Sequence, residues 1–148
     1  MIPAARKSDG YCLITINDCV MSYFFEKKLN LSFENALDRV KAALLEEGFG
    51  VVSQINMQEK MRVALKKEMK PYIILGACSP EHAWEAVNKD PNIGVLLPCN
   101  VVVSEISTDL IQVSVVNPMV AMSSVGSPDF ELMAKDVTEK LLGVVNRL

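Results

Sequence analysis

The chain has 148 residues, of which 50% are hydrophobic and 22% charged, and its formal net charge is −3. We expect one globular domain over residues 1–148, because a chain of this length and composition can bury a full core. Because the net charge is negative, the chain has no overall positive potential that would attract nucleic acid. No apolar stretch reaches the roughly 20 residues that a membrane-spanning helix needs.

Four cysteines are present: Cys12, Cys19, Cys78 and Cys99. They are too sparse for the disulfide framework of a small secreted domain, and the N-terminus shows no signal-peptide pattern. The sequence therefore predicts a cytoplasmic protein with free thiols.

The N-terminal part predicts one strand and one long helix after an irregular start. Residues 1–10 are polar and expected to be ragged, residues 11–16 alternate weakly, and residues 20–27 predict an aromatic-rich strand. Ser32 can cap the helix, and Gly48 stands where a left-handed C-terminal cap is expected. The apolar face of this helix is marked at helical spacing by Phe33, Leu37, Val40 and Leu44.

The middle of the chain alternates short strands and helices. Residues 49–56 predict a strand, and residues 58–68 predict a short basic amphipathic helix. Residues 72–75 have the apolar, β-branched composition of a central strand. A helix over residues 80–89 follows, with Ser79 at its N-cap and proline at its first position.

The C-terminal part predicts three strands, a loop and a last helix. We expect strands at residues 93–97, 101–105 and 110–116, and a loop of small residues and methionines at 119–127. The last helix begins after Ser127, and its apolar face consists of Phe130, Met133, Val137, Leu141, Val144 and Leu148. Strands and helices mix without strict alternation, which is typical of an α+β sheet covered by helices.

Two short motifs place a cysteine beside a proline at the end of an apolar run: residues 76–80 (GACSP) and 96–100 (LLPCN). Cys78 precedes a helix start, whose free N–H groups can stabilise a thiolate. Beside Cys99, Asn100 can hold a turn or donate its amide to a ligand. The 21 positions from one thiol to the other suffice for a helix and a strand. Adjacent parallel strands would thus bring the two cysteines together, although a small buried side chain and a simple turn explain the motifs as well.

A metal site has weak candidates in Cys78, His82 and Cys99. These side chains leave a tetrahedral zinc site one ligand short, whereas Cu(I) can add a sulfur from Met119 or Met122. The sequence contains no phosphate-binding glycine loop and no serine-hydrolase motif, and it leaves the cofactor unknown. We expect no positioned catalytic base, and His82 is predicted as a partly exposed helix residue.

Residues 72–80 (YIILGACSP) and 94–101 (GVLLPCNV) resemble the DUF302 family of uncharacterised prokaryotic domains, as do residues 47–51 and 117–119. The resemblance extends over residues 20–148. It implies a two-layer α+β fold similar to the β-α-β(4)-α architecture of the TATA-binding protein, with a mixed or antiparallel sheet covered by helices. It also implies frequent homodimers and no established activity.

Three positions depart from the pattern of the family that the chain resembles. The family commonly has asparagine at Ser79, leucine at His82 and an acidic residue at Asn56. A metal site that uses His82 would therefore be particular to this chain.

Three hypotheses for function follow from these observations. The first is a ligand-binding module whose site contains Cys78, Ser79, Cys99 and Asn100, for a soft metal ion or a small thiol-reactive or anionic molecule. The second is a thiol-dependent enzyme or redox protein in which Cys78 reacts and Cys99 resolves. The third is a structural or dimerisation module with buried thiols. None of the three involves nucleic acid or a membrane.

Overall fold

A computed structural model of the protein describes residues 22–148. The predictions for residues 1–10 and 11–16, and the thiols of Cys12 and Cys19, lie outside these residues. The first two positions of the predicted strand 20–27 lie outside them as well, so only the remainder of that prediction meets the structure.

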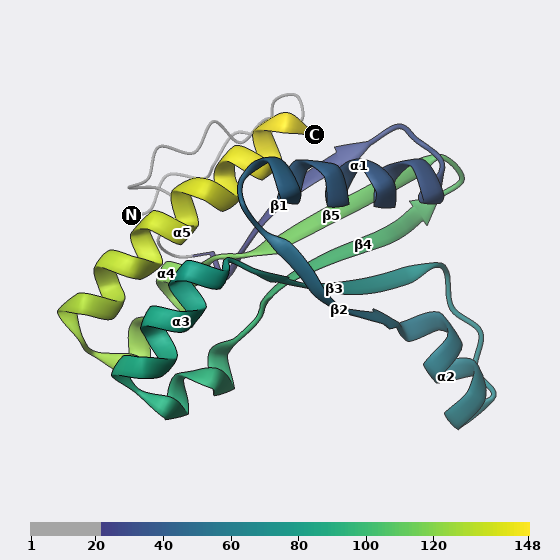
Figure 1. Cartoon of the computed structure of the whole chain (residues 1–148). Coiled ribbons are helices and arrows are strands. Elements are labelled where there is room, and N and C mark those ends of the chain that lie inside the picture. The colour runs from purple at the N-terminus through teal and green to yellow at the C-terminus, as the bar shows by residue number, and fades with distance from the viewer. Residues whose placement is uncertain (1–21) are drawn as a thin grey trace, which may run out of the picture.

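In residues 22–148, five strands form one antiparallel sheet in the order β1-β5-β4-β3-β2 (Figure 1). The strands are β1 (Phe24–Leu29), β2 (Gly50–Asn56), β3 (Tyr72–Cys78), β4 (Cys99–Ser107) and β5 (Leu110–Val116). The helices are α1 (Phe33–Glu46), α2 (Met57–Leu65), α3 (Pro80–Lys89), α4 (Pro118–Ala121) and α5 (Pro128–Arg147), with the 3-10 turns η1 (Pro91–Leu96) and η2 (Ser123–Val125). The predicted α+β class is confirmed, and the chain order is β-α-β(4)-α with short helices inserted.

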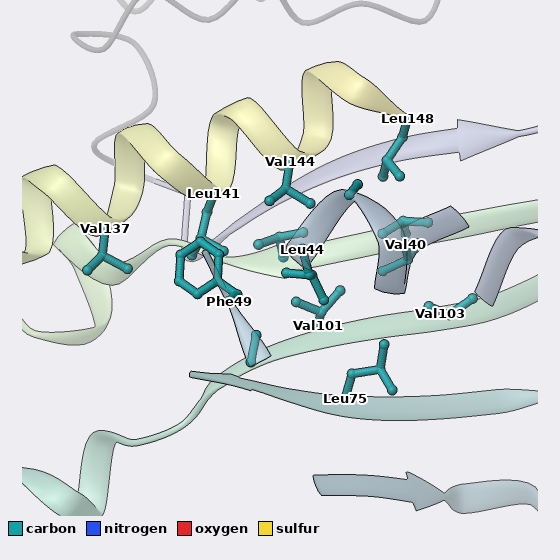
Figure 2. Close-up of a cluster of buried hydrophobic side chains, with 14 of the residues drawn as sticks. Val40, Leu44, Phe49, Leu75, Val101, Val103, Val137, Leu141, Val144 and Leu148 are labelled. Carbon is teal, nitrogen blue, oxygen red and sulfur yellow. The ribbon is translucent and has the colours of Figure 1, made fainter. Parts of the chain in front are cut away.

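Helices α1 and α5 lie together over one face of the sheet and form the second layer of the fold (Figure 1). The predicted apolar positions of α5 are all buried. Alternate residues of β5 point into the core, as the twofold period of a strand requires. Figure 2 shows the resulting core between the layers, which includes Val40, Leu44, Leu75, Val101, Leu141 and Val144, each with no exposed surface.

Helix α1 begins and ends where the sequence predicts. The Ser32 hydroxyl accepts a hydrogen bond from the Asn35 amide at 3.3 Å, which satisfies one free N–H of the first turn. At the other end Gly48 has φ +85°, a backbone conformation that favours glycine, and turns the chain into β2.

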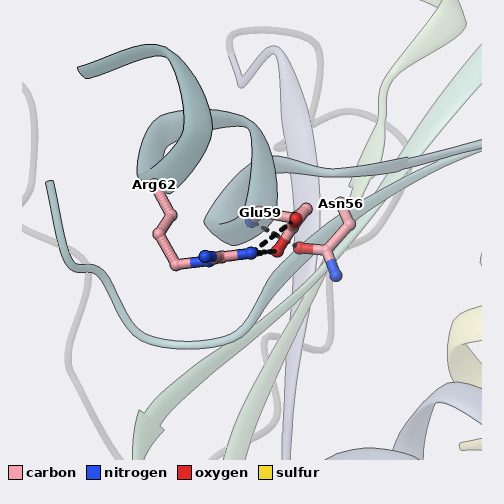
Figure 3. Close-up of polar contacts among 3 residues, drawn as sticks. All are labelled: Asn56, Glu59 and Arg62. Carbon is pink, nitrogen blue, oxygen red and sulfur yellow. Dashed lines mark hydrogen bonds and ion pairs between the residues drawn. The ribbon is translucent and has the colours of Figure 1, made fainter. Parts of the chain in front are cut away.

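Strand β2 is an edge strand of the sheet, and α2 lies beyond its end, away from α1 and α5 (Figure 1). Asn56 caps α2, because its side-chain oxygen accepts a hydrogen bond from the Glu59 amide at 3.0 Å. Glu59 also pairs with Arg62 on the exposed helix surface (Figure 3). The helix ends at Leu65, earlier than predicted, because Lys66 adopts a left-handed φ of 55° and its amide bonds back to Arg62. No residue of α2 is buried.

Two predictions in the C-terminal half of the chain were wrong. Residues 93–96 lie in η1 and Leu97 follows it, so this segment is not a strand. The Asp90 carboxylate accepts a hydrogen bond from the Asn92 amide at 2.9 Å and tightens the chain into a 3-10 turn. The predicted loop 119–127 contains η2 and all of α4 except its first residue, Pro118. Its helical start depends on Asn117, whose side chain accepts the Met119 amide at 3.1 Å.

The helices of the described chain, residues 22–148, include none with both the length and the apolar composition required to cross a lipid bilayer.

Candidate functional site: a pocket between the two cysteine motifs

The two cysteine motifs meet at one edge of the sheet. Cys78 is the last residue of β3 and Cys99 the first residue of β4, and Ala77 lies opposite Cys99 in the register of these neighbouring strands. The strands are antiparallel, whereas the spacing of the two cysteines also permitted adjacent parallel strands. The return of the chain through α3 and η1 brings the thiols together all the same.

A pocket of about 240 Å³ opens at this edge, and we call it the thiol pocket. Both cysteines line it, together with Ser79, His82 and Asn100. Most of the remaining wall is apolar and includes Phe49, Leu96, Ala121, Met122, Met133 and Val137. All four residues of the predicted ligand site, Cys78, Ser79, Cys99 and Asn100, thus line a single cavity.

Gly76 allows the second motif to pack closely against β3. A β-carbon at this position would lie 2.6 Å from the ring of Pro98 and would also meet the side chain of Ser53. Because glycine has no β-carbon, Pro98 can lie directly against the strand, and this contact places Cys99 and Asn100 at the pocket.

Ser79 stands at the N-cap of α3 as predicted, but its hydroxyl does not cap the helix. Its Oγ lies 2.8 Å from Nδ1 of His82 instead. The other ring nitrogen of His82, Nε2, lies 2.5 Å from Oδ2 of Asp136 on α5. The sequence predicted His82 as a partly exposed helix residue and did not predict these two contacts.

Sequence reasoning missed Asp136 altogether. This residue is 54 positions from His82 and belongs to the polar side of α5, where a carboxylate is ordinary. Only the packing of α3 beside α5 identifies it. The Ser79–His82 pair had a local signal, since residues three apart at a helix start are neighbours.

The three weak metal candidates do not assemble a metal centre. Within residues 22–148 there is no group of three or more cysteine, histidine or carboxylate side chains that could hold a metal ion. His82 is already hydrogen bonded on both ring nitrogens. Of the two methionines proposed as sulfur ligands, Met122 lines the thiol pocket and Met119 does not.

Burial, and to a smaller extent the electrostatic interaction with the neighbouring Cys78, raise the pKa of the Cys99 thiol to about 11. The protonated thiol is therefore the dominant form of Cys99 at neutral pH. Since the thiolate is the nucleophile and the metal ligand, Cys99 is a poor candidate for either role.

We expect iodoacetamide to modify Cys99 slowly at neutral pH and about tenfold faster for each unit of pH, up to about pH 11. The reason is that the reactive thiolate fraction rises by this factor below the pKa. Peptide mass mapping after trypsin gives the rate, because cleavage at Lys89 separates Cys78 from Cys99. Denatured protein is the control, and equal Cys99 rates in folded and denatured protein at neutral pH would contradict the assignment.

Comparison with known proteins gives a family and a fold. The family described as "Domain of unknown function DUF302" matches residues 25–148. The crystal structure of an uncharacterized conserved protein DUF302 from Bacillus stearothermophilus is similar, with a TM-score of 0.77 and 23% sequence identity. The similarity covers 84% of this chain and 97% of the Bacillus chain. No curated protein matches the chain.

Proposed function

The chain belongs to the DUF302 family, and from the pocket between its two cysteine motifs we propose that the protein binds a small, uncharged and largely apolar molecule. The observation that carries this proposal is the convergence of Cys78, Ser79, Cys99 and Asn100 on one cavity. Apolar walls with a few convergent polar groups are the usual composition of a small-molecule site.

The charge of the lining supports an uncharged ligand. Among residues 22–148, no lysine, arginine or carboxylate side chain lines the thiol pocket. An anion would therefore meet no permanent countercharge there, and a cation would meet no carboxylate. Asn100 and the cysteine S–H groups can form hydrogen bonds with a neutral polar group at one end of such a ligand.

The other two hypotheses have less support. A soft metal ion or a thiol-resolving reaction would need the Cys99 thiolate, which the high pKa of Cys99 disfavours at neutral pH. A purely structural role for the thiols does not account for the cavity beside them. The homodimer and the cytoplasmic location both stay predictions.

We expect Ala83→Trp to weaken binding of the neutral fluorophore N-phenylnaphthylamine at least about tenfold. Ala83 lines the thiol pocket, and an indole at this position would occupy space that the ligand needs. A tenfold loss corresponds to about 1.4 kcal/mol of binding free energy. Fluorescence titration of the purified protein measures the affinity.

The matched control is Val87→Trp, one helical turn further along α3. Val87 is 43% exposed and does not line the pocket, so this variant should keep the affinity of the natural chain. Binding that survives Ala83→Trp unchanged, or no binding to the natural chain, would overturn the proposal.

A further inference from the structure

The polar contacts of Ser79, His82 and Asp136 form a continuous hydrogen-bonded chain from the thiol pocket across the boundary between α3 and α5. Ser79 lines the thiol pocket, and Asp136 lines an adjoining groove between the two helices. His82 lines both hollows, and 18% of its side chain is exposed. The imidazole thus stands between a hydroxyl on one side and a carboxylate on the other.

The contacts determine which nitrogen of the neutral imidazole carries the proton. An ionised carboxylate can only accept hydrogen bonds, so Nε2 of His82 donates to Oδ2 of Asp136 across 2.5 Å. Nδ1 is then the unprotonated nitrogen, and the Ser79 hydroxyl donates to it across 2.8 Å. In this tautomer the histidine is ready to take the hydroxyl proton.

From this geometry we propose that Ser79 is the nucleophile of an acyl-transfer site that hydrolyses small, uncharged esters, with His82 as the general base. The inference rests on the proposed function, because the ester would bind in the thiol pocket. Asp136 is a positioning residue, which holds the His82 tautomer and stabilises the charged imidazole after proton transfer.

The reaction balances with water as the only co-reactant. Ser79 Oγ forms a bond to the ester carbonyl carbon while its proton moves to Nδ1 of His82. The proton on Nδ1 then passes to the leaving alcohol as the ester C–O bond breaks, which leaves an acyl group on Ser79. Water attacks the acyl group with the same proton transfer to His82, and the carboxylic acid departs as Ser79 regains its proton.

The start of α3 provides donors for the oxyanion that forms in each step. The amides of Glu81 and His82 lie in the first turn of α3, where no intrahelical acceptor is available. The Ser79 hydroxyl does not occupy them, since it bonds the imidazole. Backbone N–H groups of this kind stabilise the negative oxygen of a tetrahedral intermediate.

The experiment is hydrolysis of p-nitrophenyl butyrate by the natural chain and by Ser79→Ala, His82→Gln and Asp136→Asn. We expect Ser79→Ala and His82→Gln to lower kcat by about 100-fold or more. Asp136→Asn should lower kcat by about tenfold or more and leave KM unchanged, because the carboxylate acts on the base and not on substrate binding. The matched control is Asp129→Asn, another exposed carboxylate of the groove, which should leave both constants unchanged.

Tandem mass spectrometry of the butyryl-enzyme identifies the nucleophile. A butyryl group on Ser79 supports the inference, and one on Cys78 or Cys99 overturns it. Hydrolysis by Ser79→Ala at the rate of the natural chain would overturn it as well. So would a change in KM without a change in kcat for Asp136→Asn.

Failure of this inference is distinguishable from failure of the proposed function. If N-phenylnaphthylamine binds both the natural chain and Ser79→Ala but the ester is not hydrolysed, the acyl-transfer site is wrong and the pocket stands. Loss of probe binding by Ala83→Trp together with normal probe binding by Ser79→Ala supports the pocket alone.

Discussion

Replacing Leu44 with alanine is expected to lower the free energy of unfolding by about 2–5 kcal/mol. Leu44 has no exposed surface and lies in the core among Val40, Phe49 and Leu141 (Figure 2). The smaller side chain loses the transfer free energy of the removed atoms and leaves a cavity that the layers can only partly close. Urea unfolding followed by circular dichroism measures the change.

The next residue along α1 provides a matched control. Leu45 is 73% exposed, so Leu45→Ala should change the free energy of unfolding by no more than about 0.5 kcal/mol. Both substitutions have the same chemistry and similar helix propensity effects, and only burial differs. Equal losses for the two variants would show that the α1–sheet packing is not as described.

Much of the fold was predictable because long amphipathic elements carry their own periodicity. The helical spacing of α1 and α5 identified which face of each helix is buried, and Ser32 and Gly48 marked the ends of α1. The strand β5 alternates buried and half-buried residues along its length, which the sequence shows as alternating apolar positions. These signals are local and do not depend on the rest of the chain.

The errors fell on short segments whose conformation depends on single side chains. An apolar run as short as residues 93–97 has no period that separates a strand from a helical turn. The hydrogen bond from the Asn92 amide to the Asp90 carboxylate stabilises the turn. In the same way the left-handed Lys66 ended α2, although no glycine marks that position.

The candidate site was predictable only as far as its residues belong to two sequence motifs. Cys78, Ser79, Cys99 and Asn100 were identified because each stands at a strand end beside a turn, and the sheet register places them together. Asp136 belongs to α5 and contacts His82 only through tertiary packing, which no local sequence pattern predicts.

Replacing Gly76 with alanine is expected to lower the free energy of unfolding by about 1–3 kcal/mol and to weaken probe binding in the thiol pocket. The new β-carbon would meet Ser53, whose short side chain can rotate away, and the Pro98 ring at 2.6 Å, which cannot move without its backbone. Pro98 must therefore shift away from β3 and take Cys99 with it. Urea unfolding and titration with N-phenylnaphthylamine measure the two effects.

Gly94→Ala is the matched control, because a β-carbon at Gly94 in η1 meets no heavy atom within 4 Å. We expect this variant to keep the probe affinity of the natural chain and to change the free energy of unfolding by at most about 0.5 kcal/mol. If Gly76→Ala were as stable as Gly94→Ala and bound the probe equally well, the close approach of Pro98 to β3 would not be what positions the second cysteine motif. If Gly76→Ala lost stability but kept probe binding, the approach would support the fold without shaping the pocket.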